Sequence, residues 1–311
     1  MKAKFTGHDT FPLRYGWLHK AINHLNNNKK LLASNENSTR EAIVELGVGK
    51  NMVNGIRYWA ECSGVIESDG ETVTDKGAYL FGSSGIVGKD PYLEQTESVW
   101  LLHFWLNFNF DFLTAYRYFF NYSNVQHFEK SKLLDDCYED VQRLVKGSVP
   151  NETTVKKDLD CFLNTYCHKQ KKSTIKDSIN EDYFSSPLSE LNLLQDNGGG
   201  FYVSDLGERP DLPIEVFIYA SIKFIEAETE GSNINTISFD ALLTKPCSPG
   251  RIFRLSESGL GQKLDEAQTY KNSGVTWVDS LGLRQIKIEK KSIKNSNNFL
   301  DAIYAGGHQH D

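Results

Sequence analysis

Two small groups of side chains have types and spacing suited to acid–base or phosphate chemistry. The first is the N-terminal pair His8 and Asp9, followed by Arg14 and Lys20. An imidazole beside a carboxylate can transfer protons, and a guanidinium can hold a phosphate through two hydrogen bonds. This compact, basic group is a candidate catalytic site. The alternative is that His8 and Asp9 cap the first helix and that Arg14 forms a structural ion pair.

The second group lies near the other end of the sequence. Asp279 is followed, after nine intervening residues, by Glu289, Lys290 and Lys291. This spacing resembles a D…ExK nuclease core, in which carboxylates hold a divalent metal ion and a lysine lies near the metal-bound water. It predicts Asp279, Glu289 and Lys291 as catalytic residues, with Mg²⁺ or a similar ion as cofactor. The alternative is a charged strand end; if the hairpin is a wing, Lys287, Lys290 and Lys291 would contact backbone phosphate.

The elements that would place such groups on a substrate begin with a helix-turn-helix pattern. Helical spacing over residues 40–46 is broken at 47–49 and resumes over 50–62. The turn signal Ser68-Asp69-Gly70 between short apolar pairs predicts a hairpin, and Thr74 is a plausible N-cap of the next helix. This order is typical of a winged helix, a module that lays one helix in a DNA major groove.

The second helix of this pattern has one apolar stripe and one polar face. The polar face carries Lys50, Asn51, Asn54, Arg57, Tyr58 and Glu61. Asn and Arg can make bidentate hydrogen bonds to base edges, and Lys and Tyr suit phosphate. All of these except Glu61, which is unfavourable for phosphate, are therefore candidate DNA contacts. The alternatives are a solvated polar face or a winged helix that docks another protein.

The C-terminal part shows a similar order. Helical patterns cover 213–227 and 238–243, a longer one extends to about residue 268, and 275–278 and 285–289 alternate like two strands. This predicts a second winged-helix module, in which Arg251 and Arg284 are candidate phosphate contacts. Between the two modules, dense aromatic residues over 97–122 predict buried helices.

The expected fold class is therefore mainly α with small β-hairpins, as tandem winged helix-turn-helix-like modules around an aromatic-rich helical core. The expected domains are 1–90, an N-terminal helix plus winged helix; 91–205, an aromatic helical domain; and 206–311, a C-terminal winged-helix-like domain.

Charge, cysteines and hydropathy limit the function classes. The net charge is −7, but the first 60 residues hold nine Lys/Arg and four Asp/Glu, for +5. A negative net charge argues against non-specific binding along DNA, but it is compatible with DNA binding through a localised basic surface. Five scattered cysteines indicate reduced thiols. No apolar run is long enough to cross a bilayer and no signal peptide is present, so we expect a cytoplasmic protein with no membrane partner.

Four blocks of the sequence carry a resemblance to a known family. They are the opening block 5–18 (FTGHDTFPLRYGWL), 46–53 with 56–59 (LGVGKNMV, IRYW), 186–191 (SPLSEL), and 248–255 with 282–286 (SPGRIFRL, GLRQI). Together they resemble a bacterial family catalogued as a domain of unknown function, which includes the SspB-type proteins of DNA phosphorothioation defence systems against phage.

The resemblance implies binding to double-stranded DNA, with single-strand nicking attributed to some members. It also implies a cysteine desulfurase, an ATPase and a sulfur transferase as partner proteins. We therefore expect a DNA-binding protein that nicks one strand to permit sulfur insertion. The alternatives are a non-catalytic, sequence-reading subunit that recruits the modification enzymes, and a protein-docking scaffold. A homodimer is compatible with each.

Overall fold

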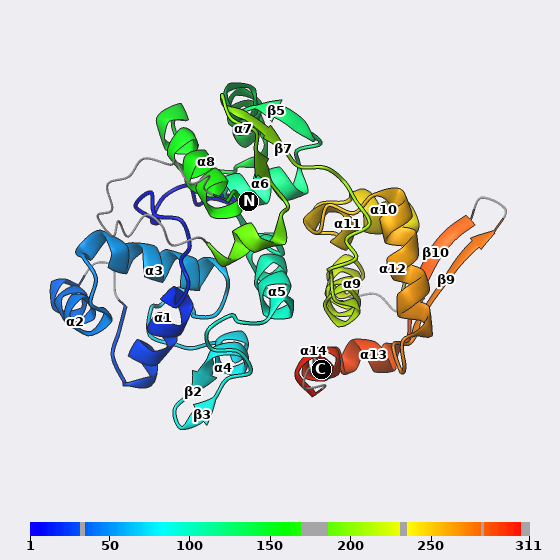
Figure 1. Cartoon of the computed structure of the whole chain (residues 1–311), viewed down its shortest axis with the longest axis horizontal. Helices are drawn as coiled ribbons and strands as arrows, with labels where there is room; N and C mark the ends of the chain where they lie inside the picture. Colours follow the sequence, from blue (N-terminus) through cyan, green and yellow to red (C-terminus); the bar gives the residue numbers. More distant parts are fainter. Residues whose placement is uncertain (32–34, 169–185, 231–234, 281–282, 306–311) are drawn as a thin grey trace, which may run out of the picture. The chain divides into compact units, whose positions relative to one another are not determined.

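The computed structural model describes residues 1–31, 35–168, 186–230, 235–280 and 283–305. The chain forms two compact units (Figure 1). The first comprises Met1–Leu106, Phe110–Tyr118 and His127–Ser204, and the second comprises Asn107–Asn109, Phe119–Gln126 and Asp205–Asp311. The long segment of the second unit starts at Asp205, and the residues on both sides of position 90 belong to the first unit. The expected division into three domains stays a prediction.

The first unit begins with the helices expected from the helix-turn-helix pattern. They are α1 (Trp17–Asn26), α2 (Glu36–Leu46), α3 (Lys50–Cys62) and α4 (Asp75–Phe81). Gly47 ends α2 in a left-handed conformation with φ of 65°, which glycine adopts without strain. Thr74 caps α4 as expected, its hydroxyl accepting a hydrogen bond from the Gly77 amide. The expected hairpin is a single antiparallel bridge between Ile66 and Val73.

Helix α1 starts six residues later than its apolar pattern, which begins at Phe11. Pro12 disfavours helical backbone at the residue before it, and Gly16 precedes the helix with φ of 75°.

The rest of the first unit is mainly helical, with α5 (Thr96–Asn107), α6 (Ala115–Asn121), α7 (Lys130–Leu144), α8 (Glu152–Tyr166) and the short 3-10 helix η2 (Pro187–Leu191). The last residues of α5 and of α6 are assigned to the second unit. Its strands are short: β1 (Lys2–Ala3) pairs parallel with β4 (Phe112–Leu113), β2 (Gly82–Ser83) with β3 (Ile86–Val87), and β7 (Phe201–Val203) lies between β5 (His127–Glu129) and β6 (Gln195–Asp196). Most of the aromatic stretch is buried as expected, including Trp100, Phe104 and Tyr116, whereas Phe110 is exposed.

Buried polar and aromatic contacts join the N-terminal helices to the middle segment. The buried Arg117 side chain donates from Nε to the Leu106 carbonyl at 2.7 Å and from Nη2 to the Cys62 carbonyl at 2.9 Å. The rings of Trp59 and Tyr116 stack with centroids 5.8 Å apart. These contacts connect residues 1–90 to the rest of the first unit.

The second unit combines helices with one three-stranded sheet. Its elements are α9 (Ile214–Glu228), β8 (Thr236–Ser238), α10 (Phe239–Thr244), α11 (Pro249–Ile252), α12 (Glu257–Thr269), β9 (Val275–Ser280), β10 (Leu283–Ile288), α13 (Lys290–Lys294) and α14 (Asn297–Ala305). The sheet is antiparallel with order β8-β10-β9. Within this unit, β9 and β10 extend as a long hairpin beyond the helices (Figure 1); the turn expected at 280–282 falls largely outside the described residues.

The expected helix up to residue 268 is divided into α11 and α12, because Arg254 between them has a left-handed φ of 54°. The mainly α class with small β elements is confirmed. None of the described helices combines the length and apolar character that a bilayer crossing requires.

Candidate functional site

The structure brings together two of the sequence-predicted groups, the N-terminal block and the polar face of α3. They line a pocket of about 290 Å³, named here the N-terminal pocket. Its lining residues are Lys4, Thr6, Gly7, Asp9, Asn54, Arg57, Tyr58 and Glu61. Lys4 and Thr6 were not singled out from the sequence, although both belong to the basic N-terminal block.

Two glycines allow the N-terminal segment to lie close against α3. Gly7 has φ of 113°, and a Cβ there would lie 3.0 Å from the Tyr58 ring. On the helix, a Cβ at Gly55 would lie 3.3 Å from the His8 carbonyl oxygen and 3.0 Å from the Trp17 ring. Since larger residues would force these segments apart, the pocket depends on glycine at both positions.

The carboxylates of the N-terminal pocket are engaged by neighbouring donors. The Asn54 side-chain amide donates to Asp9 Oδ2 at 2.8 Å. Glu61 is paired twice, with Arg57 Nε at 2.6 Å and with Lys4 Nζ at 3.0 Å. Two cations and two carboxylates leave the pocket with no formal net charge, so it offers neither a strong phosphate site nor a free carboxylate pair.

His8 lies in the protein interior and does not act with Asp9. Its side chain is buried, and Nδ1 accepts a hydrogen bond from the Thr10 amide at 3.0 Å. Its Nε2 lies 3.0 Å from Oδ1 of Asp158 on α8, whose Oδ2 accepts a hydrogen bond from the Ala115 amide at 2.6 Å. The carboxylate partner of His8 is thus 150 residues away in sequence, and Asp9 instead faces the pocket. The predicted His8–Asp9 catalytic pair is not formed.

The side chains of Arg14 and Lys20 also make contacts within the first unit. The Arg14 guanidinium carbon lies 5.5 Å from the ring centroids of both Phe11 and Trp17, within the range of cation–π attraction. The Lys20 ammonium donates to the Leu46 carbonyl at 2.8 Å, at the C-terminal end of α2, where a cation is favourable. Arg14 therefore packs on aromatic rings instead of forming the expected ion pair.

The polar face of α3 is only partly open to solvent. Lys50 and Asn51 are exposed in its first turn, whereas Asn54 and Arg57 are half-buried. Tyr58 was expected on the exposed face, but only 3% of its surface is accessible. The His8 ring lies edge-on to it with centroids 5.2 Å apart, and burial raises the pKa of its hydroxyl well above the usual range. Tyr58 is therefore a core residue and not an available phosphate contact.

The strand register keeps the proposed D…ExK carboxylates apart. Asp279 pairs with Arg284 near the tip of the hairpin, whereas Glu289 follows the pair Ile288–Val275 at its base. Asp279 lies four positions after Val275, which corresponds to about 13 Å along the strand, and Glu289 lies one position beyond the Ile288–Val275 pair. Asp279 and Glu289 therefore cannot share a metal ion in this arrangement. Glu289 and Lys291 instead line a separate cavity of about 710 Å³ in the second unit.

The two arginines expected to hold phosphate in the second unit are occupied by its own groups. Arg251 donates to the carbonyls of Asn121 and Ser123 at 3.2 and 2.8 Å, and burial lowers the pKa of its guanidinium. Arg284 lies 2.6 Å from a Glu257 carboxylate oxygen. Lys287 is exposed on β10, and Lys290 and Lys291 are exposed at the start of α13, so the three lysines predicted as phosphate contacts of a wing are all open to solvent.

The residues of the predicted sites do not fit a divalent metal centre. Among the described residues, no three His, Cys, Asp or Glu side chains are grouped so that they could share a metal ion. Glu61 already faces two cations, and Asp279 and Glu289 lie at opposite ends of a hairpin. We therefore derive no metal-dependent step from these groups.

Comparison with known proteins gives one family and two similar structures. A family model described as "Protein of unknown function (DUF4007)" matches residues 5–304. A solved structure described as "SspB crystal structure" has a TM-score of 0.80 and 27% identity, covering 99% of this chain and 91% of that chain. Another, described as "Magnesium ion-bound SspB crystal structure", has a TM-score of 0.79 with the same identity and coverage. No curated protein matches the chain.

Proposed function

Because this chain belongs to the DUF4007 family of proteins of unknown function, and because it is similar to SspB structures over nearly its whole length, we propose that it is a DNA-binding protein of a DNA phosphorothioation system. The observation that carries DNA binding is the exposed first turn of α3, with Lys50 and Asn51 on its surface. In this proposal, α2, α3 and the 66–73 hairpin form a winged helix, and the N-terminal half of α3 approaches the duplex.

The position of Lys50 and Asn51 suits contact with DNA. They lie at the N-terminal end of a 13-residue helix, where the helix dipole and free backbone N–H groups favour anions such as phosphate. Lys50 forms no ion pair with another described residue. Asn54 follows Lys50 by four residues, and Arg57 follows Asn54 by three, so all three lie on the same side of the helix. They reach DNA only by exchanging Asp9 and Glu61 for base or phosphate acceptors.

The second unit supports a division of labour. In this proposal the second unit is also a winged helix, with α12 in the place of the recognition helix; its element order α9-β8-α10-α11-α12-β9-β10 and its sheet order β8-β10-β9 support the proposal. The exposed charged side chains of α12 are all acidic: Glu257, Asp265 and Glu266. Its Lys263 is buried and donates to the Leu212 carbonyl at 2.7 Å. Such a face repels phosphate, so we assign DNA contact to α3 and protein docking to α12.

Strand nicking is the second candidate activity. It is supported by the resemblance to SspB-type proteins and by the existence of a magnesium-bound SspB structure. The predicted D…ExK residues do not converge, so nicking by this chain would require carboxylates other than Asp279 and Glu289 acting together. The described residues favour the alternative hypothesis, a non-catalytic subunit that binds DNA and recognises its sequence.

Salt dependence of duplex binding tests the role of α3. Fluorescence anisotropy with a labelled duplex gives the slope of log affinity against log salt. Each phosphate contact contributes about 0.9 to that slope, so we expect Lys50→Ala to reduce its magnitude by about 0.9. Lys157→Ala is the matched control, because Lys157 is an exposed lysine of α8 in the same unit and its removal changes the net charge equally. Identical slopes for the two variants would overturn the assignment.

A further inference from the structure

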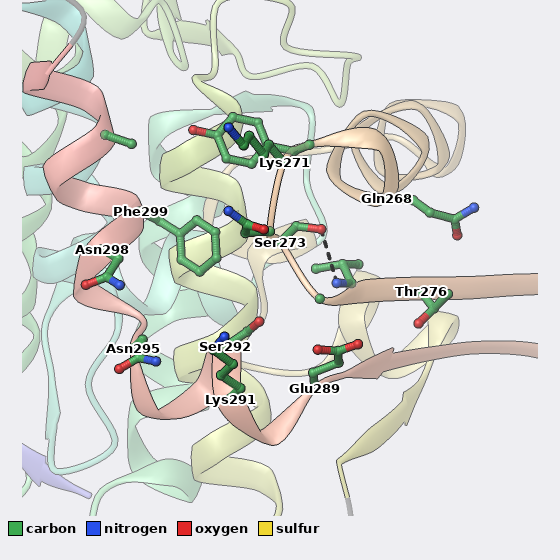
Figure 2. A pocket seen from close by; sticks show the side chains of 15 residues that line it. Gln268, Lys271, Ser273, Thr276, Glu289, Lys291, Ser292, Asn295, Asn298 and Phe299 are labelled. Carbon is green, nitrogen blue, oxygen red and sulfur yellow. Dashed lines mark hydrogen bonds between the residues drawn. The ribbon is translucent and has the colours of Figure 1, made fainter.

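One cavity of the second unit combines amide, aromatic and charged side chains. It has a volume of about 710 Å³ and is named here the amide pocket. One wall is the connection from α12 into β9, from Gln268 to Thr276. The other runs from the end of β10 through α13 into α14, from Glu289 to Ala302 (Figure 2). Both walls belong to the same unit.

Close backbone packing fixes the two walls against each other. The Glu289 amide donates to the Gly274 carbonyl at 2.9 Å. Gly274 has φ of 63°, and a Cβ there would lie 2.3 Å from the Ser292 hydroxyl oxygen. Ser273 is buried, and its hydroxyl accepts a hydrogen bond from the Val275 amide at 3.2 Å (Figure 2). The pocket is therefore held in shape by its own walls and requires glycine at position 274.

Amide side chains are the main polar groups of the amide pocket. Gln268, Asn272, Asn295 and Asn298 each offer a carbonyl oxygen and an NH₂ group. Gln268 uses its oxygen to accept from the Trp277 amide at 3.0 Å, which leaves its NH₂ group as a donor. Paired donors and acceptors of this kind match the edges of nucleobases.

Two aromatic rings line the pocket: Tyr270 is partly exposed and offers a stacking face, whereas Phe299 is mostly buried. Their centroids lie 6.3 Å apart and their planes are inclined at 54°. In Figure 2 the Phe299 ring projects from α14 among the lining side chains. Burial and the neighbouring Glu215 raise the pKa of Tyr270 to about 12, so this side chain offers its ring and not an ionised oxygen. Aromatic faces bind bases by stacking regardless of base identity.

Charged side chains complete the pocket. Lys271, Lys291 and Glu289 line it, and none of the three forms an ion pair with another described residue. Their sum is one positive charge. Lysines suit phosphate, and a carboxylate can accept a hydrogen bond from a base amino group.

We propose that the amide pocket binds a nucleotide, with the base against Tyr270 and the amides and the phosphate at Lys271 and Lys291. The cavity volume lies within the range of about 300–1,000 Å³ typical of ligand sites. A wholly apolar ligand would leave the amides unsatisfied, and inorganic phosphate would leave the rings unused. The nucleotide could come from free mononucleotide or from a strand of DNA. The inference does not rest on α3.

Calorimetric titration of the full chain tests the proposal. The probes are each of the four deoxynucleoside monophosphates, inorganic phosphate, and a short single-stranded oligonucleotide. We expect at least one monophosphate to bind more tightly than inorganic phosphate. Tighter binding of the oligonucleotide would identify a DNA strand as the source, and equal or weaker binding would identify the free nucleotide. No heat from any nucleotide at millimolar concentration, or equal affinity for phosphate alone, would overturn the proposal.

Matched variants connect such binding to the amide pocket. Loss of one good base contact weakens binding by about tenfold, and we expect this for Asn298→Ala; Lys271→Ala, which removes a phosphate contact, should also weaken nucleotide binding. The controls are Asn297→Ala and Lys294→Ala, which change exposed residues of α14 and α13 outside the lining set. Equal losses in controls and pocket variants would overturn the assignment. Lys50→Ala should leave mononucleotide binding unchanged, so failure of the α3 proposal and failure of this one are distinguishable.

Discussion

Removal of either partner of the buried His8–Asp158 contact should destabilise the protein whether or not DNA is present. Asp158 is 2% exposed and His8 is 3% exposed. Truncation of Asp158 removes the acceptor of the Ala115 amide and the carboxylate that lies beside His8 Nε2. Since Nδ1 of His8 accepts from the Thr10 amide, the ring is neutral, and the loss comes from buried polar groups left without a partner at about 1–3 kcal/mol each. We therefore expect Asp158→Ala, which leaves two such groups, to lose about 2–6 kcal/mol and His8→Ala, which leaves the Asp158 carboxylate without its histidine, to lose about 1–3 kcal/mol.

Urea unfolding of the full chain, followed by tryptophan fluorescence, measures these losses. In the double variant the two losses should not add, and the coupling should be about 1–3 kcal/mol. Asp160→Ala is the control from the same helix, since this carboxylate is partly exposed and paired with Lys130 at the surface; its loss should stay below about 1 kcal/mol. A His8→Ala variant that keeps its stability within about 0.5 kcal/mol but loses DNA function would refute the structural role and restore the catalytic hypothesis.

Two further predictions concern nicking and the thiols. If the protein converts supercoiled plasmid to open circle with Mg²⁺, Asp279→Asn should nick at the wild-type rate, since Asp279 lies more than about 13 Å from Glu289 along the hairpin and cannot share a metal ion with it; a large loss of nicking would show that Asp279 belongs to the nicking site. All five cysteines are free and buried, and burial raises the pKa of Cys167 to about 12, so the reactive thiolate is scarce. A thiol reagent at pH 8 should therefore label none of them in the native protein and all five in urea; rapid native labelling would contradict the burial.

Local periodicity accounts for the parts of the fold that the sequence predicted well. Helix α3 has the expected bounds of residues 50–62, because its apolar stripe repeats every three or four residues and glycine precedes it. The strands β9 and β10 follow alternating patterns on both sides of a turn. Each of these signals lies within about a dozen neighbouring residues, so one sequence is sufficient to detect it.

The candidate sites were less predictable, because distant contacts decide which side chains are accessible. The expected exposure of Tyr58 followed from helix periodicity alone, and the N-terminal segment that covers it comes from residues about fifty positions earlier. Asp158 had no local signal that connects it to His8. The separation of Asp279 and Glu289, by contrast, could have been deduced. Once a turn is placed near residue 281, Asp279 lies beside it, and a residue ten positions later lies at the other end of the hairpin.

The basic character of the N-terminal region is smaller in the folded protein than in the sequence. The first 60 residues carry a formal charge of +5, but most of their cations are used within the unit. Ion pairs join Lys29 to Glu45, Lys30 to Glu71, Arg40 to Glu36, and both Lys4 and Arg57 to Glu61. Phosphate affinity depends on cations that can release their counterions to DNA, and a lysine already paired with a carboxylate contributes little. Binding through α3 should therefore depend on few phosphate contacts, so its specificity must come from direct contacts such as Asn51 and not from bulk charge.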